Sequence, residues 1–513
     1  MNSTRQINPL EEALKRRDLD AFNVLLAAGA DIRYVDENGY DALINAAYAY
    51  LNDDKLIDVL GMLIGLGASL STMSEYGESA VGVLSFHSRF QAVKFLLEAG
   101  ADPKLVGLTP LMKAVAFGSV EDVEFVIQSG VDLEERERYH RTAWLIAVQS
   151  GDIEKAELLV SRGADINARG WLGRPSTFFA VESIGHAMLA WLLDQGIDIG
   201  LKDDGGDTVL CEAVDHGNAE CVEFLVSLGV DVNEKAHVAT PLWHACTKRI
   251  AMALLEAGAD PNELMSEGRR AILGYDPEPD EEALRVSNAN FHKYRTPRFG
   301  KSNPERMNNA FWEAMIRSGV NAYQAEMRLN DGKTTWQTSG KFGEPTWCAD
   351  RFGQSITFLP DGRIVQVAGE HEDGSDPDFC IYNDVFVHDV DGSITIYGYP
   401  DDLFPPTDFH TATLVGEYIY LIGSVGYPGT RGFDFTPVYR LSVVDFHIEP
   451  LETSGDSPGW IGRHRAKLVS PHEISVSGGN VIVKNGDKEL FVRNEESFVL
   501  DVRMMIWRRE LAQ

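Results

Sequence analysis

The 513-residue sequence is poor in cysteine, poor in basic residues and free of long apolar runs. Its five cysteines are scattered and include no Cys-x-x-Cys pair, so the sequence predicts neither a disulfide framework nor a zinc site. Residues 1–25 lack the apolar core of a secretion signal, and no stretch of about 18 apolar residues occurs. We therefore expect a soluble, cytoplasmic protein that does not contact a membrane.

Acidic residues outnumber basic ones, with 78 Asp and Glu against 46 Lys and Arg, and the formal net charge is −32. Both halves of the chain share this excess. A field of this sign repels nucleic acid and anionic membranes and attracts basic proteins. The charge thus favours a basic protein partner, with solubility alone as the competing explanation.

The sequence also lacks the motifs of common active sites. It has no serine nucleophile elbow, no phosphate-binding loop and no Gly-x-Gly-x-x-Gly fingerprint, so we expect a non-enzymatic protein without a cofactor. The acidic segment 370–378 offers an alternative, because Glu372, Asp373, Asp376 and Asp378 could ligate a hard cation such as calcium. Their order lacks the spacing of a calcium loop, and a solvated turn is the competing interpretation.

A short motif is repeated eight times in the first 260 residues. Each copy is a glycine, a small apolar residue and usually an aspartate, after an apolar stretch with helical spacing. The glycines are Gly29, Gly67, Gly100, Gly130, Gly163, Gly196, Gly229 and Gly258. A period near 33 residues is typical of stacked helical repeats, and each glycine is expected to end a helix in the left-handed conformation.

A hydroxyl residue that can cap the next helix follows roughly ten residues after several of these glycines, as at Thr109, Thr142, Thr208 and Thr240. The segment Thr240-Pro241-Leu242-Trp243-His244 and the Gly-Ala-Asp-Ile-Asn ending at 163–167 resemble the ankyrin repeat. The resemblance covers residues 8–265 and implies an all-α solenoid that binds a protein. The second repeat is longer at 51–54 and the junction at 103–107 is shorter, so an irregular stack is expected there.

Between the repeats and the C-terminal region lies an acidic, proline-bearing run at 276–282, which is typical of a linker. A single amphipathic helix is expected from Pro304 to Met327, acting as a brace between domains. We therefore expect three segments: an ankyrin domain at 1–270, a linker and bracing helix at 271–333, and an all-β domain at 334–513.

The C-terminal region carries a second period. Short strands with two-residue alternation end at Gly369, Gly423 and Gly478, which are 54 and 55 residues apart. Together with Asn383-Asp384-Val385, this pattern resembles kelch repeats over residues 334–510. The resemblance implies three four-stranded blades of a partial propeller. His410 and His464 occupy equivalent places in successive units, so we assign them to structural hydrogen bonds.

Three blades leave two open sheet edges, which a second copy, an unusual closure or the segment 307–330 would cover. Covering within one chain avoids repulsion between two acidic domains, so we expect a monomer.

The loop tips between ankyrin units are the predicted binding site, because large side chains there escape core packing. The candidates are Tyr34, Tyr40, Tyr76, Arg136, Arg138, Tyr139, Arg169, Trp171 and Arg174, with the acidic residues Asp203 and Asp204 beside them. The expected function is a non-catalytic scaffold for protein interaction, in a sharper form an immunity-type inhibitor of a basic protein. The alternative is a metal-dependent or other enzyme activity in the β domain, with the ankyrin repeats recruiting substrate.

Overall fold

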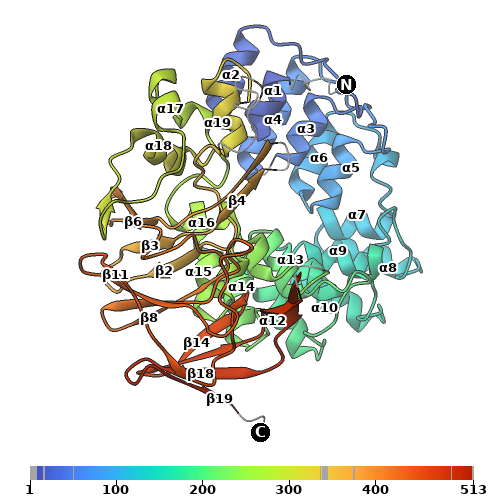
Figure 1. Ribbon diagram of the computed structural model, residues 1–513. Helices are drawn as coiled ribbons and strands as arrows, with labels where there is room; N and C mark the ends of the chain where they lie inside the picture. The colour runs from blue at the N-terminus through green and yellow to red at the C-terminus, as the bar shows by residue number, and fades with distance from the viewer. Residues whose placement is uncertain are drawn as a thin grey trace. The chain divides into compact units, whose positions relative to one another are not determined.

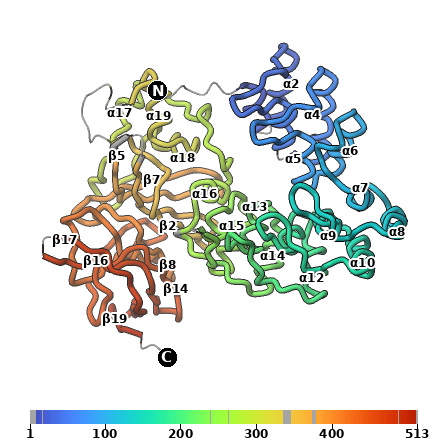
Figure 2. The backbone as a smooth tube through the Cα atoms, turned by 90° about the vertical axis from the view of Figure 1, so that its right-hand side faces the viewer, coloured from blue at the N-terminus to red at the C-terminus, as the bar shows by residue number. Residues whose placement is uncertain are grey.

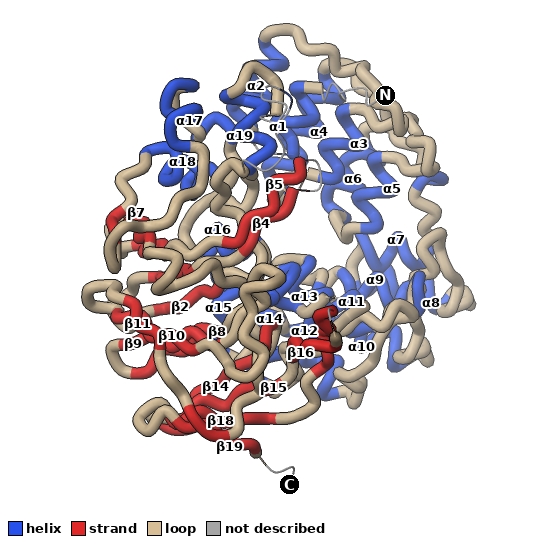
Figure 3. The backbone as a smooth tube through the Cα atoms, viewed as in Figure 1, coloured by secondary structure: helices blue, strands red, loops and turns tan. Residues whose placement is uncertain are grey.

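The computed structural model describes residues 8–510 except 16, 17, 50, 238, 335, 336, 338–344, 374, 375 and 487. The chain divides into two compact units, residues 1–241 (unit 1) and 242–513 (unit 2). Unit 1 is helical, and the strands belong to unit 2 (Figure 3). None of the helices in the described ranges has the length and apolarity needed to cross a membrane.

Unit 1 consists of successive helix pairs, which follow one another along the stack in chain order (Figure 2). The first helices of the pairs are α1 (Pro9–Lys15), α3 (Ala42–Tyr48), α5 (Ala80–Phe86), α7 (Pro110–Phe117), α9 (Ala143–Gln149), α11 (Ser176–Val181) and α13 (Val209–Asp215). The second helices are α2 (Leu19–Ala27), α4 (Asp53–Gly65), α6 (Phe90–Glu98), α8 (Val120–Gln128), α10 (Ile153–Ser161), α12 (Ala187–Asp194) and α14 (Ala219–Ser227).

Local signals set the helix boundaries in unit 1. All eight motif glycines have positive φ, between 79° and 105°, which confirms the prediction that each ends a helix. The hydroxyls of Thr109, Thr142 and Thr208 accept the backbone N–H three residues later, as expected of helix N-caps. The additional residues of the second repeat place Asn52 as a cap and give the 13-residue helix α4.

The expected irregularity lies between α5 and α7. Neighbouring first helices pack closely at α3–α5, α7–α9, α9–α11 and α11–α13, whereas α5 and α7 make few contacts. The short 3-10 helix η1 (Pro103–Leu105) occupies the shortened junction. Arg141 from the following repeat reaches back to α5, where its guanidinium donates to the Ser85 carbonyl at 2.7 Å and to the Ser85 hydroxyl at 3.1 Å.

The last helical repeat lies at the start of unit 2. Its opening segment, the closest match to the ankyrin sequence pattern, forms only the 3-10 helix η3 (Pro241–His244) instead of a full first helix. It is followed by α15 (Lys248–Glu256), η4 (Pro261–Glu263) and α16 (Ser266–Ile272). Further helical segments are η5 (Glu281–Ala283), α17 (Asn288–Tyr294), α18 (Ala310–Ser318) and α19 (Ala322–Leu329).

Each of the three repeat units predicted in the C-terminal region forms a sheet that contains four neighbouring antiparallel strands, and among the described residues no sheet closes on itself. The first sheet holds β1 (Glu305–Arg306), β7 (Ile394–Gly398), β6 (Val385–His388), β3 (Ile364–Val367) and β2 (Ser355–Phe358). The second holds β11 (Ile448–Pro450), β10 (Val438–Ser442), β9 (Tyr418–Ile422) and β8 (Thr411–Val415). The third holds β12 (Ser454–Gly455), β19 (Ile506–Arg509), β18 (Ser497–Asp501), β15 (Glu473–Ser477) and β14 (Arg465–Ser470).

A two-stranded hairpin and a three-stranded sheet are inserted into these units. One pairs β4 (Glu370–Asp373) with β5 (Asp376–Ile381), and the other joins β13 (Ile461–Gly462), β16 (Asn480–Asn485) and β17 (Lys488–Arg493). The described residues of the acidic segment, 370–373 and 376–378, therefore lie on the strands of a β-hairpin, where the sequence suggested either a cation-binding loop or a solvated turn. The described backbone places Glu372 at an exposed strand position, while the side chains of Asp373, Asp376 and Asp378 lie outside the described residues.

The first strands β2, β8 and β14 pack in succession, and the last helical repeat contacts both ends of this row (Figure 1). At one end η4 lies against β2, and Arg269 donates to the Arg351 carbonyl at 2.7 Å. At the other end Arg465 of β14 pairs with Asp260 at 3.1 Å. A helical repeat thus occupies the gap between the first and third sheets.

The single helix expected from Pro304 to Met327 is wrong. Residues 305–306 form strand β1, which pairs with the outer strand β7, and two helices follow. Gly319 ends α18 in the left-handed conformation, with φ of 69°. Phe311 and Trp312 of α18 share a buried cluster with Trp347 and Phe386 of the first sheet region. This segment therefore covers one edge and contributes to the core of the first sheet.

Candidate functional site

The predicted loop tips of unit 1 are connected to one another along the stack. The backbone N–H of Trp171 donates to the Tyr139 carbonyl at 3.1 Å, and that of Asp204 donates to the Leu172 carbonyl at 2.9 Å. Arg169 donates to the Lys202 carbonyl at 2.8 Å. Each tip is therefore held in place by its neighbour.

Several predicted site residues form hydrogen bonds within these loops. Arg136 donates to the carbonyls of His140, at 2.8 Å, and of Arg169, at 2.5 Å. The Asp203 carboxylate accepts the N–H groups of Gly205 at 2.9 Å and Asp207 at 2.8 Å, which fixes its own turn. These contacts assign Arg136, Arg169 and Asp203 a positioning role in the loops.

The other predicted residues are exposed to solvent or half-buried. Tyr34, Tyr76, Arg138, Trp171 and Asp204 are exposed, and Trp171 has half of its surface in solvent, at 51%. Tyr40, Tyr139 and Arg174 are half-buried and lie together with side chains from the first helices. We call the surface that these residues and the first-helix ends form the first-helix face. It consists of Tyr40, Tyr48, Tyr76, Glu78, Phe86, His87, Tyr139, Arg141, Gln149, Trp171, Arg174, Glu182, Glu212 and His216.

Aromatic rings line the first-helix face from the first repeats to the fourth. The Tyr40 ring lies 6.0 Å from that of Tyr48 and 6.3 Å from that of Tyr76. His87 continues from Tyr48 at 6.0 Å. Further along the chain, Phe86 lies 4.8 Å from Tyr139. These spacings are those of interacting aromatic pairs, so the rings form an almost continuous row.

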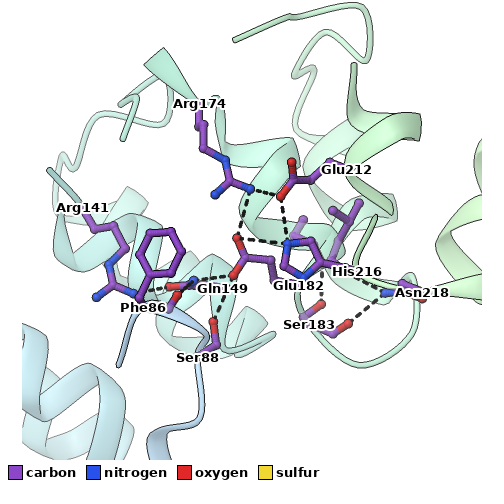
Figure 4. A network of polar contacts seen from close by, with 12 residues as sticks. Phe86, Ser88, Arg141, Gln149, Arg174, Glu182, Ser183, Glu212, His216 and Asn218 are labelled. Atoms are coloured by element: carbon purple, nitrogen blue, oxygen red, sulfur yellow. Dashed lines mark hydrogen bonds and ion pairs between the residues drawn. The ribbon is translucent and has the colours of Figure 1, made fainter. Parts of the chain in front are cut away.

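A polar network continues the face through the following repeats (Figure 4). Gln149 accepts from Arg141 at 2.7 Å and donates to Glu182 at 2.6 Å. Arg174 then pairs with Glu182 at 3.3 Å and with Glu212. The carboxylate of Glu212 also lies 2.9 Å from Nε2 of His216. The network therefore connects side chains of three consecutive repeats.

Arg141 is the buried end of this network. Its side chain is 1% exposed and pairs with the fully buried Glu137 at 3.0 Å. The same Glu137 oxygen accepts the backbone N–H groups of Tyr139 and Arg141. Because Oε1 of Glu137 accepts both backbone N–H groups and the Arg141 guanidinium, this buried pair fixes the loop and the ring of Tyr139 beside it, although Oε2 of Glu137 is buried without a hydrogen-bond partner.

Electrostatics differ at the two ends of the face. Burial, assisted by the hydrogen bond to Glu78, raises the pKa of Tyr40 to about 12, so the phenol stays a donor. Burial lowers the pKa of His216, although the Glu182 carboxylate opposes this shift. His216 is therefore neutral at pH 7 while Arg174 supplies the positive charge between the two glutamates.

Glu182, Glu212 and His216 are the residues that come closest to a metal-ligand set in the described part of the chain. One ligand atom from each lies within 4.8 Å of the others. The Arg174 guanidinium already bonds both carboxylates, and a metal ion would have to displace it. The arrangement thus presents an ion-pair network in which one guanidinium is shared by two carboxylates.

The sequence prediction missed the residues contributed by the first helices. Tyr48, Phe86 and Gln149 are the last residues of α3, α5 and α9, and Glu182 follows α11 directly. All four lie seven residues after the residue that caps their helix. Aligning the repeats on their caps would have shown aromatic and polar residues at this equivalent position, where a core position would carry aliphatic ones.

In unit 2, His410 and His464 have the structural role that we predicted. Nε2 of His410 lies 2.8 Å from the Ser355 hydroxyl, and Nε2 of His464 lies 2.9 Å from the Thr411 hydroxyl. Each bond connects one sheet to the preceding sheet. Both rings are fully buried, and burial lowers the pKa of each to about 3. They are neutral connecting groups at ordinary pH.

Unit 2 also contains a pocket of about 260 Å³, lined by aromatic and proline side chains that include Phe299, Trp347, Tyr382 and Tyr427. Its buried polar groups have partners within the protein. Asp384 pairs with Arg351 and accepts from the Trp347 indole at 2.8 Å. The pocket offers mainly apolar surface.

Comparison with known proteins identifies the helical repeats. The family described as "Ankyrin repeats (3 copies)" matches residues 84–170 and 177–264. Solved structures also match, among them the ankyrin repeat domain of Bcl-3, described as a unique member of the IkappaB protein family. That match has 25% identity, covers 49% of this chain and 99% of the other, and has a TM-score of 0.22. No curated protein matches the chain. The molecule thus has a helical ankyrin region followed by a strand-rich region, and ankyrin repeats indicate a role in protein–protein interaction.

Proposed function

We propose that the protein binds a basic protein partner on the first-helix face of its ankyrin repeats. The observation that carries the proposal is the composition of equivalent positions. In the repeats of α3, α5, α9 and α11, the residues just before the helix caps and at the first-helix ends are aromatic, charged or, at Gln149, an amide, and they lie side by side. Exposed tyrosine, tryptophan and arginine side chains are the types that dominate the energetics of protein interfaces.

The charge of unit 1 supports a basic partner. Residues 1–241 carry 38 acidic and 19 basic residues. An excess of this size attracts a positively charged protein over the Debye length and disfavours acidic competitors. Neutralisation of a basic protein, as by an immunity-type inhibitor, is a narrower form of the same proposal, and the acidity supports it.

We further infer that the strand-rich region is a kelch-like partial propeller. The 54- and 55-residue spacing of its glycines and the three sheets of four consecutive strands support this inference. The last helical repeat would then take the place of a missing blade.

Affinity capture with matched variants tests the binding face. The full chain, immobilised, would be exposed to a lysate of the cells that carry its gene, and captured proteins would be identified by mass spectrometry. We expect a basic protein that is retained by the wild type and lost by the double variant Tyr48→Ala/Trp171→Ala. Phe125→Ala is the control, because Phe125 is 75% exposed on the second helix α8, outside the face.

The comparison between variants decides the outcome. Two side chains at the centre of an interface cost about 2 kcal/mol or more when truncated, which is at least about thirtyfold in affinity. Equal capture by the double variant and the wild type would show that the face is not the site. Capture of an acidic protein would contradict the proposal that the partner is basic.

A further inference from the structure

The tyrosine cluster at the first repeats consists of Tyr40, Tyr48, Tyr76 and Glu78. Both hydroxyls of the first pair donate to the same carboxylate: Tyr40 to Oε2 of Glu78 at 2.7 Å and Tyr48 to Oε1 at 2.9 Å. Tyr76 is held separately, with its hydroxyl 3.4 Å from the Asn38 side-chain oxygen. The cluster therefore presents three phenol rings around one carboxylate whose orientation is fixed by two hydrogen bonds.

The rings of this cluster face in different directions and remain accessible. The planes of Tyr40 and Tyr48 are inclined by 81°, and those of Tyr40 and Tyr76 by 33°. Tyr76 is 66% exposed and Tyr48 is 39% exposed. A cation is attracted to the face of an aromatic ring when it lies within about 6 Å of the ring centre, and several rings around one point add to this attraction. Because the rings are in contact with one another at about 6 Å, a cation would lie on the accessible surfaces of Tyr48 and Tyr76 and not between the rings.

Glu78 adds a formal negative charge to the cluster. Within the described part of the chain no lysine or arginine forms an ion pair with its carboxylate, which accepts hydrogen bonds from the two neutral phenols. Burial raises the pKa of both Tyr40 and Tyr48, so these phenols stay protonated and do not add a competing charge. The cluster thus combines a half-buried carboxylate with aromatic faces and lacks a cation of its own.

The opposite end of the face provides an internal comparison. There the carboxylates of Glu182 and Glu212 share the guanidinium of Arg174. The guanidinium already lies between those carboxylates, so an incoming cation would have to displace it.

We propose that the tyrosine cluster receives a lysine or arginine side chain of the basic partner, with Glu78 as its ion-pair acceptor and the accessible rings of Tyr48 and Tyr76 beside it. This proposal rests on the proposed function, since it names the chemistry by which the first-helix face recognises that partner. The overall acidity of unit 1 brings the partner to the surface, and the cluster selects one side chain.

Titration of the full chain with short cationic probes tests the proposal. Fluorescein-labelled pentalysine and pentaarginine would be followed by anisotropy at 150 mM salt, where diffuse attraction is screened beyond about 8 Å. The matched acidic variants are Glu78→Gln and Glu75→Gln; both remove one charge from the same loop, and Glu75 is exposed outside the cluster. We expect Glu78→Gln to weaken binding of at least one probe fivefold or more and Glu75→Gln to weaken it less than twofold.

A second pair of variants isolates the rings. Tyr76→Ala should weaken the same probe about threefold, whereas Tyr34→Ala should not, because Tyr34 is an exposed tyrosine outside the cluster. Pentalysine with acetylated side chains should not bind, since acetylation removes the charge. Circular dichroism melts of the four variants identify any loss of folding, and a variant whose unfolding midpoint shifts by more than about 3 °C is replaced by Tyr76→Leu or Glu78→Met in the titration.

Equal weakening by Glu78→Gln and Glu75→Gln would overturn the proposal, because it would show that diffuse charge binds the probes. Binding of the acetylated peptide with unchanged affinity would overturn it as well. Both results leave the broader function to its own test: capture that depends on Tyr48 and Trp171 would keep the face as the binding site while removing the cluster as its cation receptor.

Discussion

Equivalent positions in the two units carry different kinds of residues. In unit 2 the residue that precedes the first strand of each sheet is Gln354, His410 or His464, and all three are buried. In unit 1 the residue that precedes a first-helix cap is Tyr40, Glu78, Arg141 or Arg174 in the repeats that form the face. The position in unit 2 carries a planar hydrogen-bonding side chain in all three sheets. The position in unit 1 is aromatic in one repeat, acidic in another and basic in two.

The difference follows from what each position contacts. The unit 2 residues lie between sheets, where His410 and His464 must reach a hydroxyl of the preceding sheet, so their shape and polarity are restricted. In unit 1, Tyr40, Glu78 and Arg174 are only half-buried at the surface of the stack, whereas Arg141 is buried and pairs with Glu137. Variation within a repeated position thus indicates a surface free of packing constraints, whereas repetition of one side-chain type indicates a structural contact.

Shortened chains should give the largest effect, because they test where the strand-rich region begins. Arg269 and Arg270 of α16 donate to backbone carbonyls of Arg351 and Ile316, so α16 belongs to the packing of unit 2. We expect residues 242–513 to unfold in one cooperative transition and residues 274–513 to lose that transition and bind a hydrophobic dye. Urea unfolding followed by circular dichroism measures both. Identical transitions would show that the last repeat is not required.

Within unit 1 the largest effect of a single substitution is expected at Arg141. Replacing it by alanine leaves Glu137 buried without its cation, and breaking a buried pair on one side costs about 3–5 kcal/mol. Arg138→Ala is the control: this side chain is exposed, and its loss should change the free energy of unfolding by about 0.5 kcal/mol or less. A loss below 1 kcal/mol at Arg141 would contradict its role at the α5–α7 junction.

Much of the fold could be predicted because it depends on local rules. The motif glycines, the threonine caps and the three strand units follow from turn, capping and periodicity preferences within about ten residues. The helix expected over 304–327 was wrong because Ser318-Gly319, a stop signal, stands inside an apolar pattern that continues on both sides. Local patterns also give no indication that α16 packs with the sheets, since that depends on residues more than 80 positions apart.

The candidate site was predicted only in part for a related reason. Loop tips can be recognised in the sequence, and several of the predicted residues do contribute to the face. Which of them remain available depends on contacts between repeats, such as the bond from Arg169 to the Lys202 carbonyl 33 residues later. The helix-end residues Glu182 and His216 become part of a network only when consecutive repeats are stacked, which a single repeat cannot show.

Acidification should have a moderate effect on the stability of unit 2. His410 and His464 have folded pKa values near 3, below the ordinary value of 6.5, so the unfolded chain binds their protons first. The stability that they contribute is complete above pH 6.5 and is lost as the pH falls toward 3, at up to about 1.4 kcal/mol per pH unit for each histidine. Unit 2 should therefore lose stability on acidification from pH 6.5 to pH 4.

The double variant His410→Gln/His464→Gln serves as the control for this pH dependence. Glutamine does not titrate, and the first sheet already has Gln354 at the equivalent position. The variant should start from lower stability at pH 7 but show a flatter profile below pH 6.5. Urea unfolding of residues 242–513 at several pH values measures the slope. An unchanged slope in the variant would mean that other groups cause the acid sensitivity.

The smallest effect is expected where the last helical repeat reaches the third sheet. Arg465 is 52% exposed and Asp260 is 12% exposed, and such partly exposed pairs couple by about 0.2–1 kcal/mol. A double-mutant cycle with Arg465→Ala and Asp260→Ala in residues 242–513 measures this coupling free energy. The pair Arg493–Glu495, exposed at 83% and 75%, is the matched reference and should couple near zero. Coupling at Asp260 above the reference would make the ion pair part of the contact that fills the gap between the first and third sheets. If the two pairs have equal coupling free energies, η4 and Arg269 make the stabilising contact between the last helical repeat and the sheets. The third sheet would then be connected to the repeat mainly through its neighbouring sheets.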